Sequence, residues 1–95
     1  MARVELSVAA VDDLDRLIAA LSLPTDTRAR LANSLRALED LPRLGVDLGG
    51  RWQGTRFVLG PSRWMLVVYE FSEVDDRVVV LTIQDARSSA AAVHR

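Results

Sequence analysis

The sequence has 95 residues and a formal net charge of −1, with 12 arginines, 13 acidic residues and no lysine. A chain of this length forms one domain, residues 1–95. Its pI of 5.7 is far below the ~9 expected of a generic nucleic-acid binder. Without cysteine, and with His94 as the one histidine, we expect no disulfide, metal or other cofactor. The start, "MARVELSVAAVDD", has acids where a signal peptide needs an apolar run, so we expect a soluble cytoplasmic protein.

The N-terminal segment predicts a strand and then a helix. The stretch "ARVELS" alternates apolar and polar residues, as a strand with one buried face does. Ser7 is a suitable N-cap for the helix that follows. Apolar residues then recur every three or four positions and form one stripe, at Val11, Leu14, Ile18 and Leu21. The early aspartates of this helix are expected to be solvated residues that suit the positive end of the helix dipole: Asp12, Asp13 and Asp15.

A second helix is predicted between two prolines. Pro24 ends the first helix, and Thr25 or Asp26 caps the second. The second helix ends before Pro42 and Gly45 in "LPRLG". One face of it is apolar, at Leu31, Leu35 and Leu38.

Three strands are predicted in the second half of the chain, over Trp52–Leu59, Trp64–Phe71 and Arg77–Asp85. The links "GPS" and "SEVDD" have the lengths of hairpin connections. The tail "ARSSAAAVHR" is either a short helix or a frayed end. The order strand, helix, helix, three strands predicts an α+β fold, with two helices packed on one face of a mainly antiparallel four-stranded sheet.

The distribution of charge singles out the first hairpin. Residues 1–50 hold six arginines and eight acids, whereas residues 51–69 hold three arginines and no acid. Because the helices cover one face of the sheet, we expect the other face to be open, and the period of two places Trp52, Gly54, Arg56 and Val58 together. Arg56 and Arg63 are therefore candidates to project over the open face or to rim it. Arg87 and His94 follow where the last strand ends, and Arg51 is explained equally well by stacking on its neighbour Trp52.

Four segments occur in the order and spacing of a known family. They are "ELSVAAVDDLDRL", "LEDLPRLG", "RFVLGPSRWMLVVYEF" and "DRVVVLTIQDAR". Each is mostly a core pattern, but together they follow the strand, helix, helix, meander order. In these features the chain resembles the RelE/ParE superfamily of bacterial type II toxins over nearly its whole length.

The resemblance implies a function and a set of residues. RelE-like members are mRNA endonucleases of the ribosomal decoding site, where the 2′-hydroxyl of the message attacks its adjacent phosphate. That reaction needs a base, cations for the developing charge and an acid, but no metal. The family's basic positions match Arg56, Arg63 and Arg87, and its terminal acid/base position falls near His94. These four are the catalytic residues that the resemblance implies, with inhibited translation and growth arrest as the outcome.

The same resemblance leaves a second class of function open. ParE-like members lack the nuclease residues and inhibit DNA gyrase by binding it. Here Met65 stands in the region where the third strand of the nucleases carries an arginine, and the chain is not basic. The alternatives to a ribosome-dependent mRNA endonuclease are therefore a ParE-like gyrase inhibitor and a degenerate toxin that only binds its antitoxin. Each implies a cognate antitoxin as partner, in a heterodimer or heterotetramer.

Overall fold

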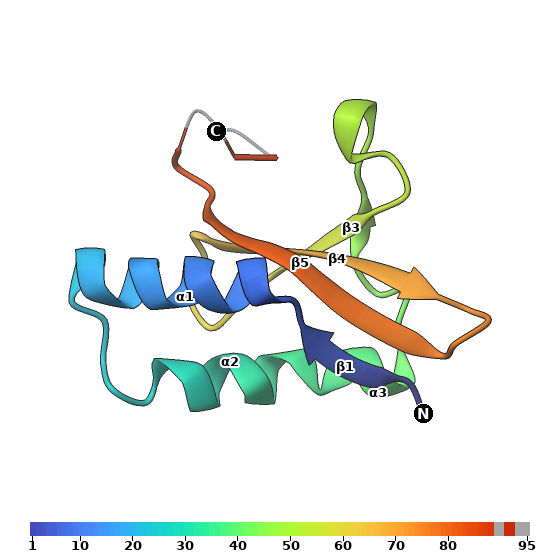
Figure 1. Ribbon diagram of the computed structural model, residues 1–95, viewed down its shortest axis with the longest axis horizontal. Coiled ribbons are helices and arrows are strands. Elements are labelled where there is room, and N and C mark those ends of the chain that lie inside the picture. The colour runs from blue at the N-terminus through green and yellow to red at the C-terminus, as the bar shows by residue number, and fades with distance from the viewer. Residues whose placement is uncertain (89–90, 93–95) are drawn as a thin grey trace.

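The computed structural model describes residues 1–88, 91 and 92, and Figure 1 shows a twisted sheet with the helices packed against it. The elements in chain order are β1 (Arg3–Leu6), α1 (Val8–Leu21), α2 (Thr27–Leu35), α3 (Ala37–Asp40), β2 (Val46–Asp47), the 3₁₀ helix η1 (Gly50–Trp52), β3 (Arg56–Leu59), β4 (Met65–Ser72) and β5 (Arg77–Asp85). No helix within the described residues is long and apolar enough to cross a membrane.

The sheet confirms the predicted α+β class and its meander. Its strand order is β1-β5-β4-β3-β2, with β1 parallel to β5 and the other neighbours antiparallel. It has five strands rather than the predicted four, because Val46–Asp47, expected to be part of a connection, pairs with Phe57 and Arg56. The predicted strand Trp52–Leu59 also begins too early. Gly50–Trp52 forms η1, and Gly54 has a φ of 90°, which an extended strand does not accommodate.

The helices begin where the sequence predicts, but the second predicted helix is divided in two. Ser7 caps α1 by accepting a hydrogen bond from the Ala10 amide at 3.1 Å, and its hydroxyl donates to the Leu81 carbonyl on β5. Asp26 precedes α2 but makes no side-chain capping bond. The second helix, predicted as continuous, divides at Arg36, whose amide bonds the Asn33 carbonyl three residues back. This hydrogen bond spans three residues instead of the four of an α-helix, so it tightens the turn and ends α2 before α3 begins.

The core lies on both faces of the sheet. The larger cluster, between sheet and helices, holds Leu14, Leu31, Leu38, Met65, Val67, Tyr69, Val78 and Val80 among others. Each such side chain contributes ~1.5–3 kcal/mol by burial. A smaller cluster lies on the other face, where Leu66, Val68 and Ala86 are buried against Trp52, Phe57 and tail residues Ala91 and Ala92. The prediction of an uncovered face is therefore wrong for this part of the sheet.

Candidate functional site

Arg56 lies on the helix side of the sheet, whereas the sequence analysis expected it over the open face or at its rim. It is paired on β3 with Tyr69 of β4, whose ring is in the helix-side cluster, and directly paired residues share a face. Its guanidinium donates to the carbonyls of Arg43 at 3.2 Å and Gly45 at 3.0 Å, and it lies 3.4 Å from Asp47. Only 26% of the side chain is exposed. Arg56 therefore binds the protein's own backbone.

Tyr69 completes this arrangement from the neighbouring strand. Its side chain is fully buried, and its hydroxyl donates to the Pro42 carbonyl at 2.8 Å and accepts from the Gly45 amide at 2.9 Å. Burial raises the pKa of Tyr69, although the Gly45 hydrogen bond and the charge of Arg56 act in the opposite direction. Together, Arg56 and Tyr69 fix the loop between α3 and β2 to the sheet. The sequence analysis did not predict these contacts between the loop and the sheet.

Replacing Arg56 with alanine should lower the free energy of unfolding by about 1–2 kcal/mol, because it removes a charged donor from two loop carbonyls. Chemical denaturation measures the change. Arg63→Ala is the matched control: its side chain is exposed and has no hydrogen bond or ion pair with a described residue, so its effect should stay within ~0.5 kcal/mol. Equal stability of the two variants would contradict a role for Arg56 in holding the loop.

Arg63 and Arg87 lie near each other at the end of the sheet where β4 begins and β5 ends. The Ala86 amide donates to the Trp64 carbonyl at 2.7 Å, and the Arg87 guanidinium stacks on the Trp64 ring, 4.9 Å from its centroid. Arg87 also donates to both carboxylate oxygens of Asp85, at 2.8 and 2.7 Å. The side-chain hydrogen bonds from Arg87 hold the pKa of Asp85 below its usual value. The charge of Arg87 is thus paired with Asp85, whereas Arg63 has no such partner among the described residues.

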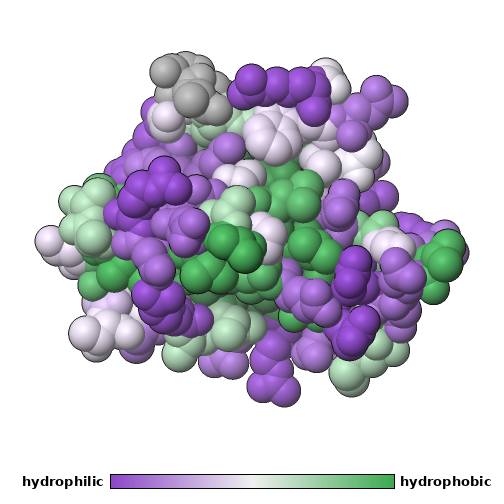
Figure 2. Space-filling model, in the orientation of Figure 1, coloured by the Kyte–Doolittle hydropathy of each residue, from purple (hydrophilic) through white to green (hydrophobic). Residues whose placement is uncertain are grey.

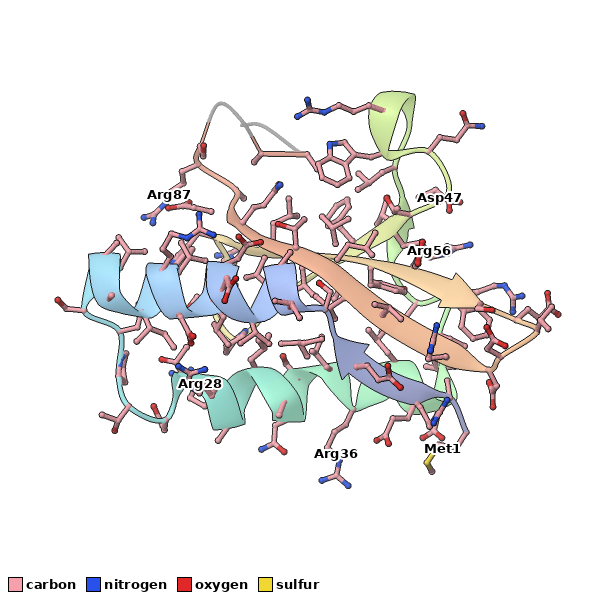
Figure 3. All side chains as sticks on the ribbon, in the orientation of Figure 1. Met1, Arg28, Arg36, Asp47, Arg56 and Arg87 are labelled. Carbon is pink, nitrogen blue, oxygen red and sulfur yellow. The ribbon has the colours of Figure 1, made fainter. Side chains whose placement is uncertain are left out.

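The four residues implied as catalytic do not form one constellation in the described structure. Figure 3 shows Arg56 beside β3 and Arg87 beyond the end of β5, well separated. His94 lies outside the described residues. Arg51 stacks on Trp52, with 5.6 Å from guanidinium to ring centroid, which agrees with the stacking interpretation. Within residues 1–88, 91 and 92, no three acidic or histidine side chains gather as a metal site would require.

A shallow apolar groove runs between the N-terminal elements and α2. Figure 2 shows apolar surface at the centre of this face, where α1, β1 and α2 meet in Figure 1. Two adjoining cavities of about 270 and 200 Å³ make up the groove and share Leu6 and Ala32. The apolar lining is completed by Val4, Val11, Leu14, Leu31 and Leu35, and the charged rim is formed by Arg28, Arg36 and Glu39. Because β1 is an edge strand, its outer backbone groups border the groove.

Comparisons with known proteins give matches among solved structures. No family model and no curated protein matches the sequence. A chain of the RelBE2 toxin–antitoxin complex from Mycobacterium tuberculosis is 21% identical, with 88% of this chain and 96% of that chain covered and a TM-score of 0.70. A copper-bound mutant toxin from Helicobacter pylori is 21% identical, with 90% and 94% covered and a TM-score of 0.66.

A third solved structure has a similar fold. A chain of the chromosomal ParDE toxin–antitoxin system of P. aeruginosa is 15% identical, with 90% of this chain and 96% of that chain covered and a TM-score of 0.63. The same helices and meander therefore occur in both RelE-type and ParE-type assemblies. This chain has the fold of the RelE/ParE toxins.

Proposed function

We propose that this protein is the toxin of a type II toxin–antitoxin pair and that it acts by binding its target, as ParE-like toxins bind DNA gyrase, rather than by cleaving mRNA. The toxin role follows from the fold shared with RelE-type and ParE-type assemblies. The mode of action is inferred from one observation: Arg56 is held at the loop before β2, away from Arg63 and Arg87.

Cleavage by the 2′-hydroxyl needs cations that converge on one phosphate, beside a group that accepts or donates the proton. Arg56 is held by loop carbonyls, and the charge of Arg87 is largely met by Asp85. Met65, in the region of the third strand where the nucleases usually carry an arginine, is completely buried in the core. Among the three implied arginines, Arg63 alone has no hydrogen bond or ion pair with a described residue, and one cation suits a docking contact better than phosphoryl transfer.

The groove along β1 is the site that we propose for the antitoxin. An amphipathic segment could place apolar side chains against Leu6, Leu14 and Leu35 and acidic ones against Arg28 and Arg36. Arg28 already has a carboxylate partner in Asp15, so an antitoxin carboxylate would extend an existing ion pair. A domain of 95 residues buries a modest share of its surface, and such a partner would stabilise it by mass action.

The two modes of action are separated by testing the purified protein, freed from its co-expressed antitoxin, in two assays. We expect inhibition of gyrase supercoiling and no cleavage of mRNA on programmed ribosomes. Arg63→Glu should weaken gyrase inhibition roughly tenfold or more, because it reverses the uncommitted charge. His94→Gln should leave the inhibition unchanged, since docking needs no proton transfer.

Each assay has an outcome that opposes the proposal. Message cleavage by the wild type that falls ~10²–10⁴-fold in His94→Gln would restore the nuclease interpretation and assign the acid/base role to His94. Growth arrest in cells with neither cleavage nor supercoiling inhibition would exclude gyrase as the target. Absence of a co-purifying partner encoded beside this chain would remove the support for a toxin–antitoxin pair.

A further inference from the structure

Two arginines lie side by side on the sheet face away from the helices. Arg3 of β1 pairs directly with Arg77 of β5. Their neighbours Val4 and Val78 pack in the helix-side cluster, so alternation directs both arginines to the opposite face. Neither guanidinium has a hydrogen bond or ion pair with another described residue. Directly opposed like charges are destabilising. An anion bound between the two arginines would offset this repulsion.

Arg77 provides a second, independent indication. Its Nε atom is buried and has no acceptor within the part of the chain that the structure describes. A buried donor without a partner carries a desolvation penalty. Acids are available in the chain, since six other arginines form ion pairs, namely Arg16, Arg28, Arg36, Arg43, Arg56 and Arg87. The Arg3–Arg77 pair therefore has no acidic partner among the described residues, whereas six of the twelve arginines have one.

The adjacent row of the same face has the opposite sign. Glu5 pairs with Val79, and Val79 pairs with Glu70 on its other side. Both glutamates are exposed and lie two residues along the strands from the arginine row, which is ~7 Å. The face thus presents a row of two positive charges beside a row of two negative charges.

We propose that this pattern binds an extended segment of a partner protein that carries an acidic residue and, two positions away, a basic residue. The carboxylate lies between Arg3 and Arg77 and accepts from the terminal guanidinium nitrogens of both, and the basic group meets Glu5 and Glu70. Residues i and i+2 of an extended chain share a face at the same spacing as the two rows. A nucleic-acid strand is a poor fit, because its regular phosphates would also face the glutamate row.

The test is an NMR titration of the ¹⁵N-labelled full chain with the peptide acetyl-Thr-Asp-Thr-Lys-Thr-amide. We expect the Arg77 Nε–H signal and the amides of residues 3–5 and 77–79 to shift together. Arg77→Gln and Arg3→Gln should each weaken binding roughly tenfold or more. Arg30→Gln is the matched control, since Arg30 is an exposed arginine on α2 without an ion pair to a described residue, and it should bind like the wild type.

Three results would overturn the proposal. Signals that do not move with the peptide, or that move equally with a Thr-Lys-Thr-Lys-Thr control, exclude carboxylate recognition. A single-stranded oligonucleotide that shifts the same signals more strongly would identify nucleic acid as the occupant. Sedimentation of the protein alone that changes in Arg77→Gln would identify a second copy of this chain. Arg3→Gln keeps the test decisive if Arg77→Gln does not fold, because Arg3 is exposed at the sheet edge.

Discussion

Replacing Gly45 with alanine should lower the free energy of unfolding by about 3 kcal/mol, at the upper end of the usual range for overpacking. A Cβ atom at this position would lie 2.7 Å from both the Phe57 carbonyl oxygen and the Tyr69 hydroxyl oxygen. Neither neighbour can give way easily, because one is the backbone of β3 and the other is a buried ring. The Gly45 amide would also be pushed from its hydrogen bond to Tyr69. Denaturant titration at neutral pH measures the loss.

Gly49→Ala is the control for this prediction. Gly49 lies four residues further along the chain, in the connection between β2 and η1, and has no atom within 4 Å of the added Cβ. Its φ of −114° is open to any residue, so alanine there should leave stability unchanged or raise it slightly by restricting the unfolded chain. If Gly45→Ala proved as stable as Gly49→Ala, the close approach of loop and sheet would not be a constraint.

Most of the fold could be predicted from local patterns. The apolar stripe of α1 and the serine that caps it are signals within a few residues of one another. The run Met65–Tyr69 is buried at every position, which the uninterrupted apolar sequence indicates for a strand covered on both faces. The bounds of β5 were predicted as observed, because a hairpin turn and a polar end flank an apolar run.

The face on which Arg56 lies could not be predicted in this way. Counting in steps of two from Trp52 assumes a continuous strand, but η1 and the positive φ of Gly54 intervene. Trp52 therefore packs on the far face with Leu66, while Arg56 lies on the helix side. A similar change of phase occurs in β5, where Leu81 is an extra residue between the pairs Val68–Thr82 and Tyr69–Val80. Bulges of this kind carry weak sequence signals.

At the candidate site, too, the sequence indicates which residues are unusual but not which groups they contact. The sequence identified arginines with unusual surroundings, but the acceptors of Arg56 are carbonyl groups, which every residue possesses. Asp13 was expected to be solvated, yet its carboxylate accepts from the Thr82 hydroxyl at 2.5 Å and from the Ile83 amide at 3.2 Å. These partners are 69 and 70 residues away in sequence. Contacts over such separations depend on the assembled sheet.

Tyr69→Phe should cost about 1–3 kcal/mol at neutral pH, because it leaves the Pro42 carbonyl and the Gly45 amide without their buried partner. The aromatic ring and its packing are kept, so the loss reports the two hydrogen bonds of the hydroxyl. Far-ultraviolet circular dichroism during denaturation gives the difference. A variant as stable as the wild type would show that water replaces the hydroxyl at the loop.

The same residue should govern how stability depends on pH in alkaline solution. Burial raises the pKa of Tyr69 in the folded protein above the ~10 of an unfolded tyrosine, so the unfolded chain loses its phenolic proton first. The stabilisation is therefore complete below pH ~10 and is lost as pH rises through the folded pKa. The chain has one tyrosine, no lysine and no cysteine, so no other side chain titrates between pH ~9 and ~12. We expect the free energy of unfolding to fall above pH ~10 in the wild type but to stay level in Tyr69→Phe, while phenolate absorbance follows the titration directly. An equal alkaline decline in both proteins would assign the loss to arginine or to the backbone instead.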